Sequence, residues 1–169
     1  MIAVDTNLLV YSHREDSEFH AGAKELVDAL RHQSAPWAIP WPCIHEFIAI
    51  ATHPAIYKPA STLSEALGFL DALFASPHLH LLAESPGYFE KLRGISRAAR
   101  LKGPRIHDAR VVALCLHHGV SELWSADRDF SAFPQLKARN PLVKKGRGSG
   151  LPAARGPAQS SAGSPPPGG

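Results

Sequence analysis

The 169-residue chain contains only two cysteines, Cys43 and Cys115, and no long hydrophobic segment. Each cysteine lies inside an apolar helical pattern, so we expect two buried thiols and no disulfide framework. No apolar run approaches the roughly 20 residues that cross a bilayer, which excludes a membrane-spanning helix. The first four residues lead directly into Asp5 and lack the basic start of a signal peptide. These absences together favour a protein of the reducing cytoplasm.

Charge is unevenly distributed along the chain, although its net value is only +3. Four of the 18 basic residues and none of the 15 acidic ones lie within residues 144–169, so residues 1–143 carry 14 basic and 15 acidic side chains. The end of the chain is mostly Gly, Pro and Ser, which cannot offset its own ordering entropy. We therefore predict one domain at residues 1–142 and a disordered basic tail at residues 143–169. The tail is either an inert extension or a weak nucleic-acid contact.

Apolar runs alternate with helical patterns along the predicted domain. Strands are expected at residues 2–4, 37–39, 79–83, 122–126 and 136–139. Helices are expected from residue 16 or 17, capped by Asp16 or Ser17, to about 31, and from 42 to 53, with Pro42 in the first turn. Others should run from 64, capped by Ser64, to about 75, from 86 to about 101, and from 107 to 118 before Gly119. This alternation predicts an α/β domain in which helices cover both faces of a parallel sheet.

Acidic residues follow two of the expected strands. Asp5 comes directly after the first strand and Asp127 directly after the fourth, with Asp129 two residues further on. A charged side chain beside a buried strand costs free energy unless it is paired or binds a metal ion. Each aspartate is alternatively a turn former or a helix cap. Because functional groups of such folds gather beyond the carboxyl ends of the strands, we expect these acids at one edge of the sheet.

Two further acids lie in apolar helices. Glu46 is the single acid of residues 43–51, so it faces either a polar cleft or a solvent-exposed strip. Asp108 is either a plain N-cap or an inward-facing acid, because it shares a helix face with Val111, Val112 and Cys115. Crowded carboxylates raise one another's pKa, and a hard divalent cation relieves the repulsion. Oxygen-rich sites select Mg²⁺ or Mn²⁺.

A basic stretch follows in residues 91–110, which contain seven Lys or Arg and one acid. Arg93, Arg97 and Arg100 are spaced to form one stripe on a helix, a pattern that contacts phosphate backbones. A solvated helix face is an equally weighted alternative.

Four motifs taken together resemble the PIN-domain ribonucleases, and among them the VapC toxins of type II toxin–antitoxin systems. They are Val4-Asp5-Thr6-Asn7, Glu46 within residues 41–47, Asp108-Ala109 opening a helix, and residues 125–130 around Asp127. The resemblance covers residues 1–142 and implies a PIN-like three-layer α/β/α domain with a central parallel sheet. Family members homodimerise, cleave RNA and are neutralised by a cognate antitoxin protein.

The resemblance also implies roles for individual residues. Asp5 and Asp108 match the principal ligands of Mg²⁺, for which Mn²⁺ can substitute, and Glu46 and Asp127 complete the acidic cluster. Thr6 and Asn7 match small polar positions beside the first aspartate and are expected to contact the substrate. Metal-activated water would then hydrolyse RNA phosphodiester bonds and leave a 5′-phosphate. The alternative is a PIN-like module that binds RNA or a partner without cutting. An aspartyl-phosphate enzyme is disfavoured, because Asn7 stands where it needs a second aspartate.

Overall fold

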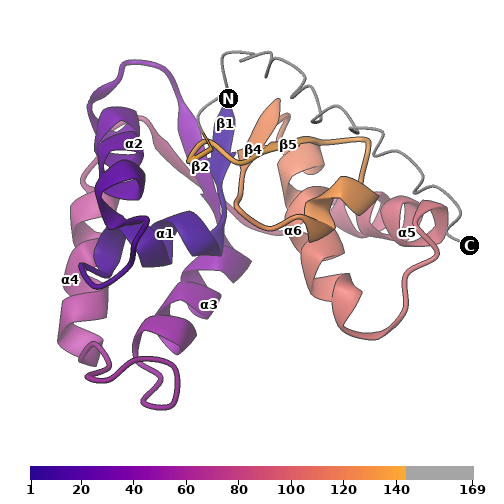
Figure 1. The fold of residues 1–169 in the computed structure, drawn as a ribbon. Coiled ribbons are helices and arrows are strands. Elements are labelled where there is room, and N and C mark those ends of the chain that lie inside the picture. Colours follow the sequence, from indigo (N-terminus) through magenta and orange to yellow (C-terminus); the bar gives the residue numbers. More distant parts are fainter. Residues whose placement is uncertain (144–169) are drawn as a thin grey trace, which may run out of the picture.

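The computed structural model describes residues 1–143, so the tail predicted at residues 143–169 lies outside the described residues except for Val143. Five parallel strands form one sheet in the order β3-β2-β1-β4-β5 (Figure 1). They are β1 (Ile2–Val4), β2 (Trp37–Pro40), β3 (Leu79–Leu82), β4 (Glu122–Trp124) and β5 (Lys137–Arg139). All five expected strands are present, and the α/β fold class is confirmed.

Six helices surround this sheet in the described part of the chain. They are α1 (Thr6–His13), α2 (His20–His32), α3 (Trp41–Ala51), α4 (Leu63–Phe74), α5 (Tyr88–Ala98) and α6 (Ile106–His117), with 3-10 turns η1 (Gly103–Arg105) and η2 (Asp129–Ala132). Helices α1 to α4 lie on one side of the sheet, and α5 and α6 lie on the other (Figure 1). The chain runs outward from β1 to β3 and then returns to β4 on the opposite side of β1. This reversal places the crevice that binds ligands in open α/β sheets at the ends of β1 and β4.

Helix α1 was not predicted from the sequence. Five of its eight residues are buried, on more than one face of the helix, so its sequence lacks the amphipathic periodicity that identifies a surface helix. The predicted start of the next helix at Asp16 or Ser17 is wrong, because α2 begins at His20. Asp16 instead forms an ion pair with Arg14.

The predicted cap of α4 is also wrong by two residues. Thr62, not Ser64, caps this helix: its hydroxyl accepts a hydrogen bond from the Glu65 amide, and the Glu65 carboxylate accepts one from the Thr62 amide. This reciprocal pair satisfies two amide groups that the first turn would otherwise leave unbonded. Helix α6, in contrast, ends as predicted before Gly119, which has a positive φ of 70°.

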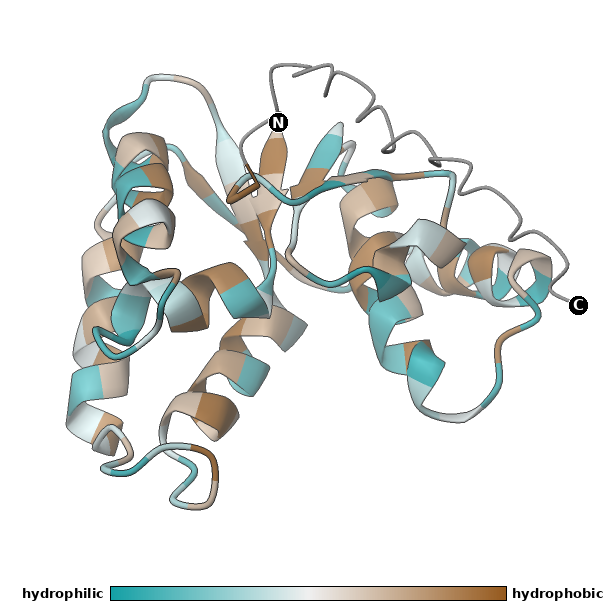
Figure 2. Cartoon of the chain, viewed as in Figure 1, coloured by the Kyte–Doolittle hydropathy of each residue, from teal (hydrophilic) through white to brown (hydrophobic). Residues whose placement is uncertain are grey.

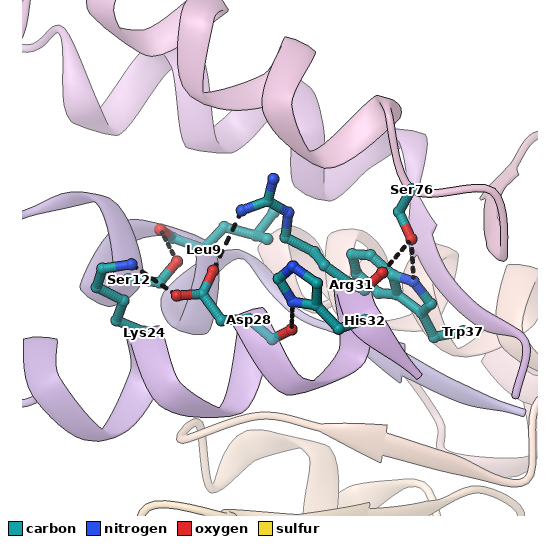
Figure 3. A network of polar contacts seen from close by, with 8 residues as sticks. All are labelled: Leu9, Ser12, Lys24, Asp28, Arg31, His32, Trp37 and Ser76. Atoms are coloured by element: carbon teal, nitrogen blue, oxygen red, sulfur yellow. Dashed lines mark hydrogen bonds and ion pairs between the residues drawn. The ribbon is translucent and has the colours of Figure 1, made fainter. Parts of the chain in front are cut away.

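The core is built around the central strands, and every residue of β2 is buried. Strand β1 is predominantly hydrophobic (Figure 2). Trp37 of β2 is fully buried, and its indole N–H donates to Ser76 Oγ at 3.2 Å, while the Ser76 hydroxyl donates to the Arg31 carbonyl (Figure 3). The network satisfies the polar atom of the largest core side chain and ties α2 to the segment before β3. Both cysteines are buried and free, as predicted.

The edges of the sheet differ from its centre, because all three residues of β5 are exposed. Lys137 and Arg139 of this edge strand form ion pairs with Glu122 of β4. Charged residues on an edge strand discourage pairing with another chain. None of the helices in residues 1–143 combines the length and the hydropathy needed to span a bilayer.

Candidate active site

A cavity of about 700 Å³ opens at the carboxyl ends of the strands. Asp5 directly follows β1, and Asp127 comes shortly after β4, while Glu46 and Asp108 reach the cavity from α3 and α6. The structure places the four predicted acids and the two predicted substrate-binding residues along one cavity: Asp5, Glu46, Asp108 and Asp127, with Thr6 and Asn7. The candidate Asp129 is exposed and is not among the lining residues.

Asp5 is the most deeply buried of these acids, with 6% of its surface exposed. Its Oδ2 accepts hydrogen bonds from Ser125 Oγ at 2.6 Å and from Asn7 Nδ2 at 2.8 Å. Its Oδ1 accepts a weak one from Cys43 Sγ at 3.5 Å. Burial raises the pKa of Asp5 to about 6, although the hydrogen bonds from Ser125, the Thr6 backbone and Cys43 lower it. All its hydrogen-bond donors within residues 1–143 are neutral, so none of them supplies a positive charge to balance the ionised carboxylate.

Asn7 joins the end of β1 to the end of β4. Its amide nitrogen also donates to Ser125 Oγ at 3.0 Å, and its amide oxygen accepts from the Ala126 amide at 3.0 Å. Ser125 Oγ in turn accepts from the Asp127 amide at 3.0 Å. Both polar atoms of the Asn7 side chain are thus occupied in fixing the geometry of two acids.

Glu46 combines the two interpretations that its sequence left open. It is exposed, together with His45 and Ala49, and this exposed strip of α3 is the wall of the cavity. Glu46 Oε2 accepts a hydrogen bond of 2.6 Å from Thr6 Oγ1. The threonine hydroxyl that the motif places beside the substrate therefore orients an acid of the site.

Asp108 is half-buried in the first turn of α6, whose N-cap is Arg105 rather than Asp108. Burial raises the pKa of its carboxyl group, and the negative charges of Asp127, Asp129 and Glu46 raise it further. The neighbouring acids therefore disfavour the ionised form of Asp108.

Comparison with known proteins assigns this arrangement to a family. The family model described as "PIN domain" matches residues 2–136. The chain belongs to the PIN domain family. VapC ribonuclease Mb2897 of Mycobacterium bovis is 31% identical over 142 residues, covering 84% of this chain and 96% of that protein. Ribonuclease VapC48 of Mycobacterium tuberculosis is 28% identical over 138 residues, covering 82% and 95%. The resemblance to VapC-type PIN domains is confirmed.

Two solved structures share the fold of this PIN domain. VapBC2 from Rickettsia felis, bound to promoter DNA, superposes with a TM-score of 0.58 at 14% identity, covering 82% of this chain and 98% of that chain. VapC20 from Mycobacterium tuberculosis, described as a sarcin-ricin loop cleaving toxin, gives a TM-score of 0.58 at 16% identity, with coverages of 78% and 94%.

The chemistry of the acids in this PIN domain fits a hard divalent cation. The negatively charged side chains that line the cavity are the carboxylates of Asp5, Glu46, Asp108 and Asp127, and burial together with the charge of neighbouring acids raises the pKa values of Asp5 and Asp108. Within residues 1–143, no three side chains of Asp, Glu, His or Cys come close enough to hold one ion among them. Mg²⁺ commonly keeps several water ligands and binds through one or two carboxylates, so the acids fit Mg²⁺ without a tighter cluster.

The predicted arginine stripe of the PIN domain is wrong. Helix α5 ends at Ala98, and Arg100 follows it with a positive φ of 48°, so the three arginines do not share one helix face. Arg93 pairs with Glu90 at 3.3 Å. The residues that line the cavity include none of the three: Arg93, Arg97 and Arg100 all lie outside it.

Several residues at the site were not predicted from the sequence. Arg110 lines the cavity two residues after Asp108, with its Nε donating to Glu84 Oε1 at 3.1 Å. Ser125 holds Asp5, and the signal for it was its place two residues before Asp127 in the same motif. Tyr57 also lines the cavity, but no local pattern marks it, because it lies in the loop between α3 and α4.

Proposed function

We propose that this PIN domain is a Mg²⁺-dependent endoribonuclease that acts as the toxin of a type II toxin–antitoxin pair. One observation carries the proposal: four acids from separate parts of the chain, Asp5, Glu46, Asp108 and Asp127, line one cavity at the switch point of the sheet. The names of its relatives, which are VapC ribonucleases, support RNA as the substrate.

The acids have different roles in this proposal. Asp5 and Asp108 would hold the cation, and Glu46 and Asp127 would complete the acidic shell or hold water. When bound, Mg²⁺ supplies an activated water molecule and stabilises the charge on the phosphodiester. Ser125 and Asn7 keep Asp5 oriented through their hydrogen bonds. Attack of water at phosphorus with departure of the 3′ oxygen gives a 5′-phosphate and a 3′-hydroxyl.

Basic residues contact the RNA backbone in this proposal. Arg110 lines the cavity and pairs with Glu84, and in this proposal its guanidinium contacts a phosphate next to the cleaved bond. Arg93 and Arg97 of α5, and Arg100 just after it, are proposed to contact the RNA outside the cavity as separate residues rather than as one stripe. Thr6 and Asn7 contribute mainly by fixing the acids, because their polar groups already bond to protein atoms.

The proposal includes two protein partners and a cytoplasmic location. A cognate antitoxin would cover the cavity, and a second copy of the chain would pack on helix α4. Three apolar side chains at one face of α4 support the dimer: Leu63, Leu67 and Phe74 are 57%, 43% and 38% exposed. Two free cysteines support a reducing compartment. Light scattering of the wild type and of Leu67→Glu tests the dimer, which the added charge should dissociate.

The activity is tested by incubating the purified, antitoxin-free protein with total RNA in Mg²⁺ or in EDTA. Asp5→Asn and Asp108→Asn test the two cation ligands. Asp71→Asn is the matched control, because Asp71 is an exposed acid on α4. We expect discrete cleavage that requires Mg²⁺, is lost in both site variants and persists in the control.

Two results would contradict the proposal. Products ending in a 2′,3′-cyclic phosphate would rule out attack by water. RNA binding that is equal in Mg²⁺ and EDTA, without cleavage by the folded protein, would indicate the non-catalytic binding module.

A further inference from the structure

The cavity has a second end that the acids do not occupy. Helices α1 and α3 both begin at the carboxyl ends of strands; the polar residue Thr6 opens α1, and Glu46 lies in the second turn of α3. About one turn further along each helix, the lining becomes apolar and aromatic, and beyond α3 the loop adds Tyr57. This apolar end is lined by Val10, Tyr11, Ala49, Ile50 and Tyr57.

The ring of Tyr57 is held in place from behind. The Arg14 guanidinium lies 4.2 Å from the ring centroid, and Arg14 is not one of the residues that line the cavity. Arg14 is itself fixed by two hydrogen bonds to Asp16, at 2.8 and 2.7 Å, and by one to Ser61 at 3.2 Å. His13 also contacts Ser61 Oγ at 2.9 Å, so the loop carrying Tyr57 is anchored to α1. A supported aromatic ring loses little conformational entropy when a ligand stacks on it.

We propose that this apolar end, named here the tyrosine pocket (Val10, Tyr11, Ala49, Ile50 and Tyr57), binds one unpaired nucleobase of the RNA beside the cleaved bond. The inference rests on the proposed function, since it names the substrate as RNA with an unpaired base. Aromatic side chains are the usual stacking surface for unpaired bases. The pocket adjoins acids suited to a phosphodiester, so one nucleotide can place its phosphate and its base in the two ends.

The size of the cavity favours a single nucleotide over a helix. Cavities of roughly 300–1,000 Å³ accommodate ligands of this size, and the whole cavity here measures about 700 Å³. A base within a duplex is stacked and paired, so it must be unpaired before it can enter such a recess. The tyrosine pocket therefore selects loops, bulges or single strands over continuous duplex.

The test uses nucleosides as probes, because they carry no phosphate and need neither metal nor cleavage. The four ribonucleosides, ribose and N-acetyl-leucinamide are titrated into the full-length protein and followed by the NMR shifts of its amides. We expect nucleosides to bind more tightly than the other two. Tyr57→Leu should weaken that binding by about tenfold or more, the effect of losing one base–aromatic stack. Tyr57→Phe keeps the ring and should bind like the wild type.

A cleavage assay in Mg²⁺ separates this inference from the proposed function. With a short RNA cut at an unpaired site, Tyr57→Leu should raise KM while Tyr57→Phe leaves it unchanged. Ribonuclease activity that is equal in all three proteins, with no nucleoside binding, would overturn the base site and leave the activity standing. Nucleoside binding that needs Tyr57, without any RNA cleavage, would support the base site and overturn the activity. Preferred binding of N-acetyl-leucinamide would overturn the base site in favour of a protein side chain as occupant.

Discussion

At the scale of a single residue, the burial of Asp5 opposes the ionisation of its carboxyl group. Burial raises its pKa from 3.8 to about 6, so ionising it in the folded, metal-free protein costs about 3 kcal/mol more than in the unfolded chain. The folded state therefore loses stability as the pH rises from about 4 to about 6, and the loss is complete above that range. A neutral side chain of the same shape escapes this cost, and a bound cation compensates for it.

We accordingly expect Asp5→Asn to raise the free energy of unfolding at pH 7.5 in EDTA, by up to about 3 kcal/mol. Asparagine can still accept the hydrogen bonds of Ser125 and Asn7 through its amide oxygen. Urea unfolding at pH 7.5 and pH 3.5 measures the effect, and the difference between variant and wild type should vanish at pH 3.5. Mg²⁺ should stabilise the wild type more than the variant. A variant less stable than the wild type at pH 7.5 would contradict this account of Asp5.

The residues that could be predicted were those whose local sequence conflicts with their surroundings. Asp5, Asp108 and Glu46 are acids beside or within apolar segments, and that mismatch is visible without a structure. Ser125 and Tyr57 carry no such mismatch, because a serine and a tyrosine are ordinary in a turn or a loop. Their importance comes from partners far away in sequence, such as Asp5 for Ser125.

At the scale of elements, strand positions were predictable and helix boundaries less so. A strand buried on both faces appears in the sequence as a short run of apolar residues, as in β1 and β2. Helix α1 is buried on more than one face and therefore shows no periodic stripe. The cap of α4 was misplaced because Thr62 and Ser64 are both good N-caps, and only the position of Glu65 three residues after Thr62 decides between them.

The capping box of α4 gives a matched pair of variants. Thr62→Ala removes the hydroxyl that accepts from the Glu65 amide, and should lower the free energy of unfolding by about 1 kcal/mol. Ser64→Ala lies within the first turn and replaces serine with a better helix former, so it should cost nothing. Thermal unfolding of both variants measures the effect. An equal loss in the two would show that Thr62 does not act as the cap.

Strand β5 is held to β4 by ion pairs between side chains as well as by the backbone pairing of the sheet. Lys137 bonds to Glu122 Oε2, and Arg139 Nε lies 2.8 Å from Glu122 Oε1. The hydrogen bond from Lys137 holds the pKa of Glu122 below its ordinary value. A lowered carboxyl pKa contributes stability above the unfolded pKa of about 4.3 and loses it as the pH falls through the folded pKa.

Glu122→Gln should therefore destabilise the protein by about 1 kcal/mol at pH 7, the upper range for a partly exposed ion pair. The loss relative to the wild type should shrink as the pH falls below about 4, where Glu122 itself is protonated. Thermal unfolding across this pH range measures it, with Glu25→Gln on the exposed surface of α2 as control. A loss that does not change with pH would mean that packing, rather than charge, explains the effect of the substitution.

At the scale of the whole molecule, the path of the chain creates the site. The return from β3 to β4 brings Asp127 to the cavity that Asp5 lines, although their positions in the sequence differ by 122. The alternation of strands and helices predicted such an edge, but it could not specify the order of the strands. Strand order decides which strand ends become neighbours, so the sequence predicted the set of acids and not the hydrogen bonds between them.

The charge division along the chain leads to a prediction about residues 144–169. Residues 1–143 carry one more acid than base, whereas the remaining segment holds Lys144, Lys145, Arg147 and Arg155. If the domain is complete without that segment, a chain ending at residue 143 should keep the melting temperature and the Mg²⁺-dependent cleavage of the full chain.

The RNA affinity of this shortened chain should depend less on salt, because each lost phosphate contact lowers the slope of log K against log salt by about 0.7 for a single strand. Filter binding from 50 to 300 mM salt measures that slope, with charge-reversal of Lys24 on α2 as control. An unchanged slope would mean that the four cations do not touch RNA, and a lower melting temperature would show that the domain extends beyond residue 143.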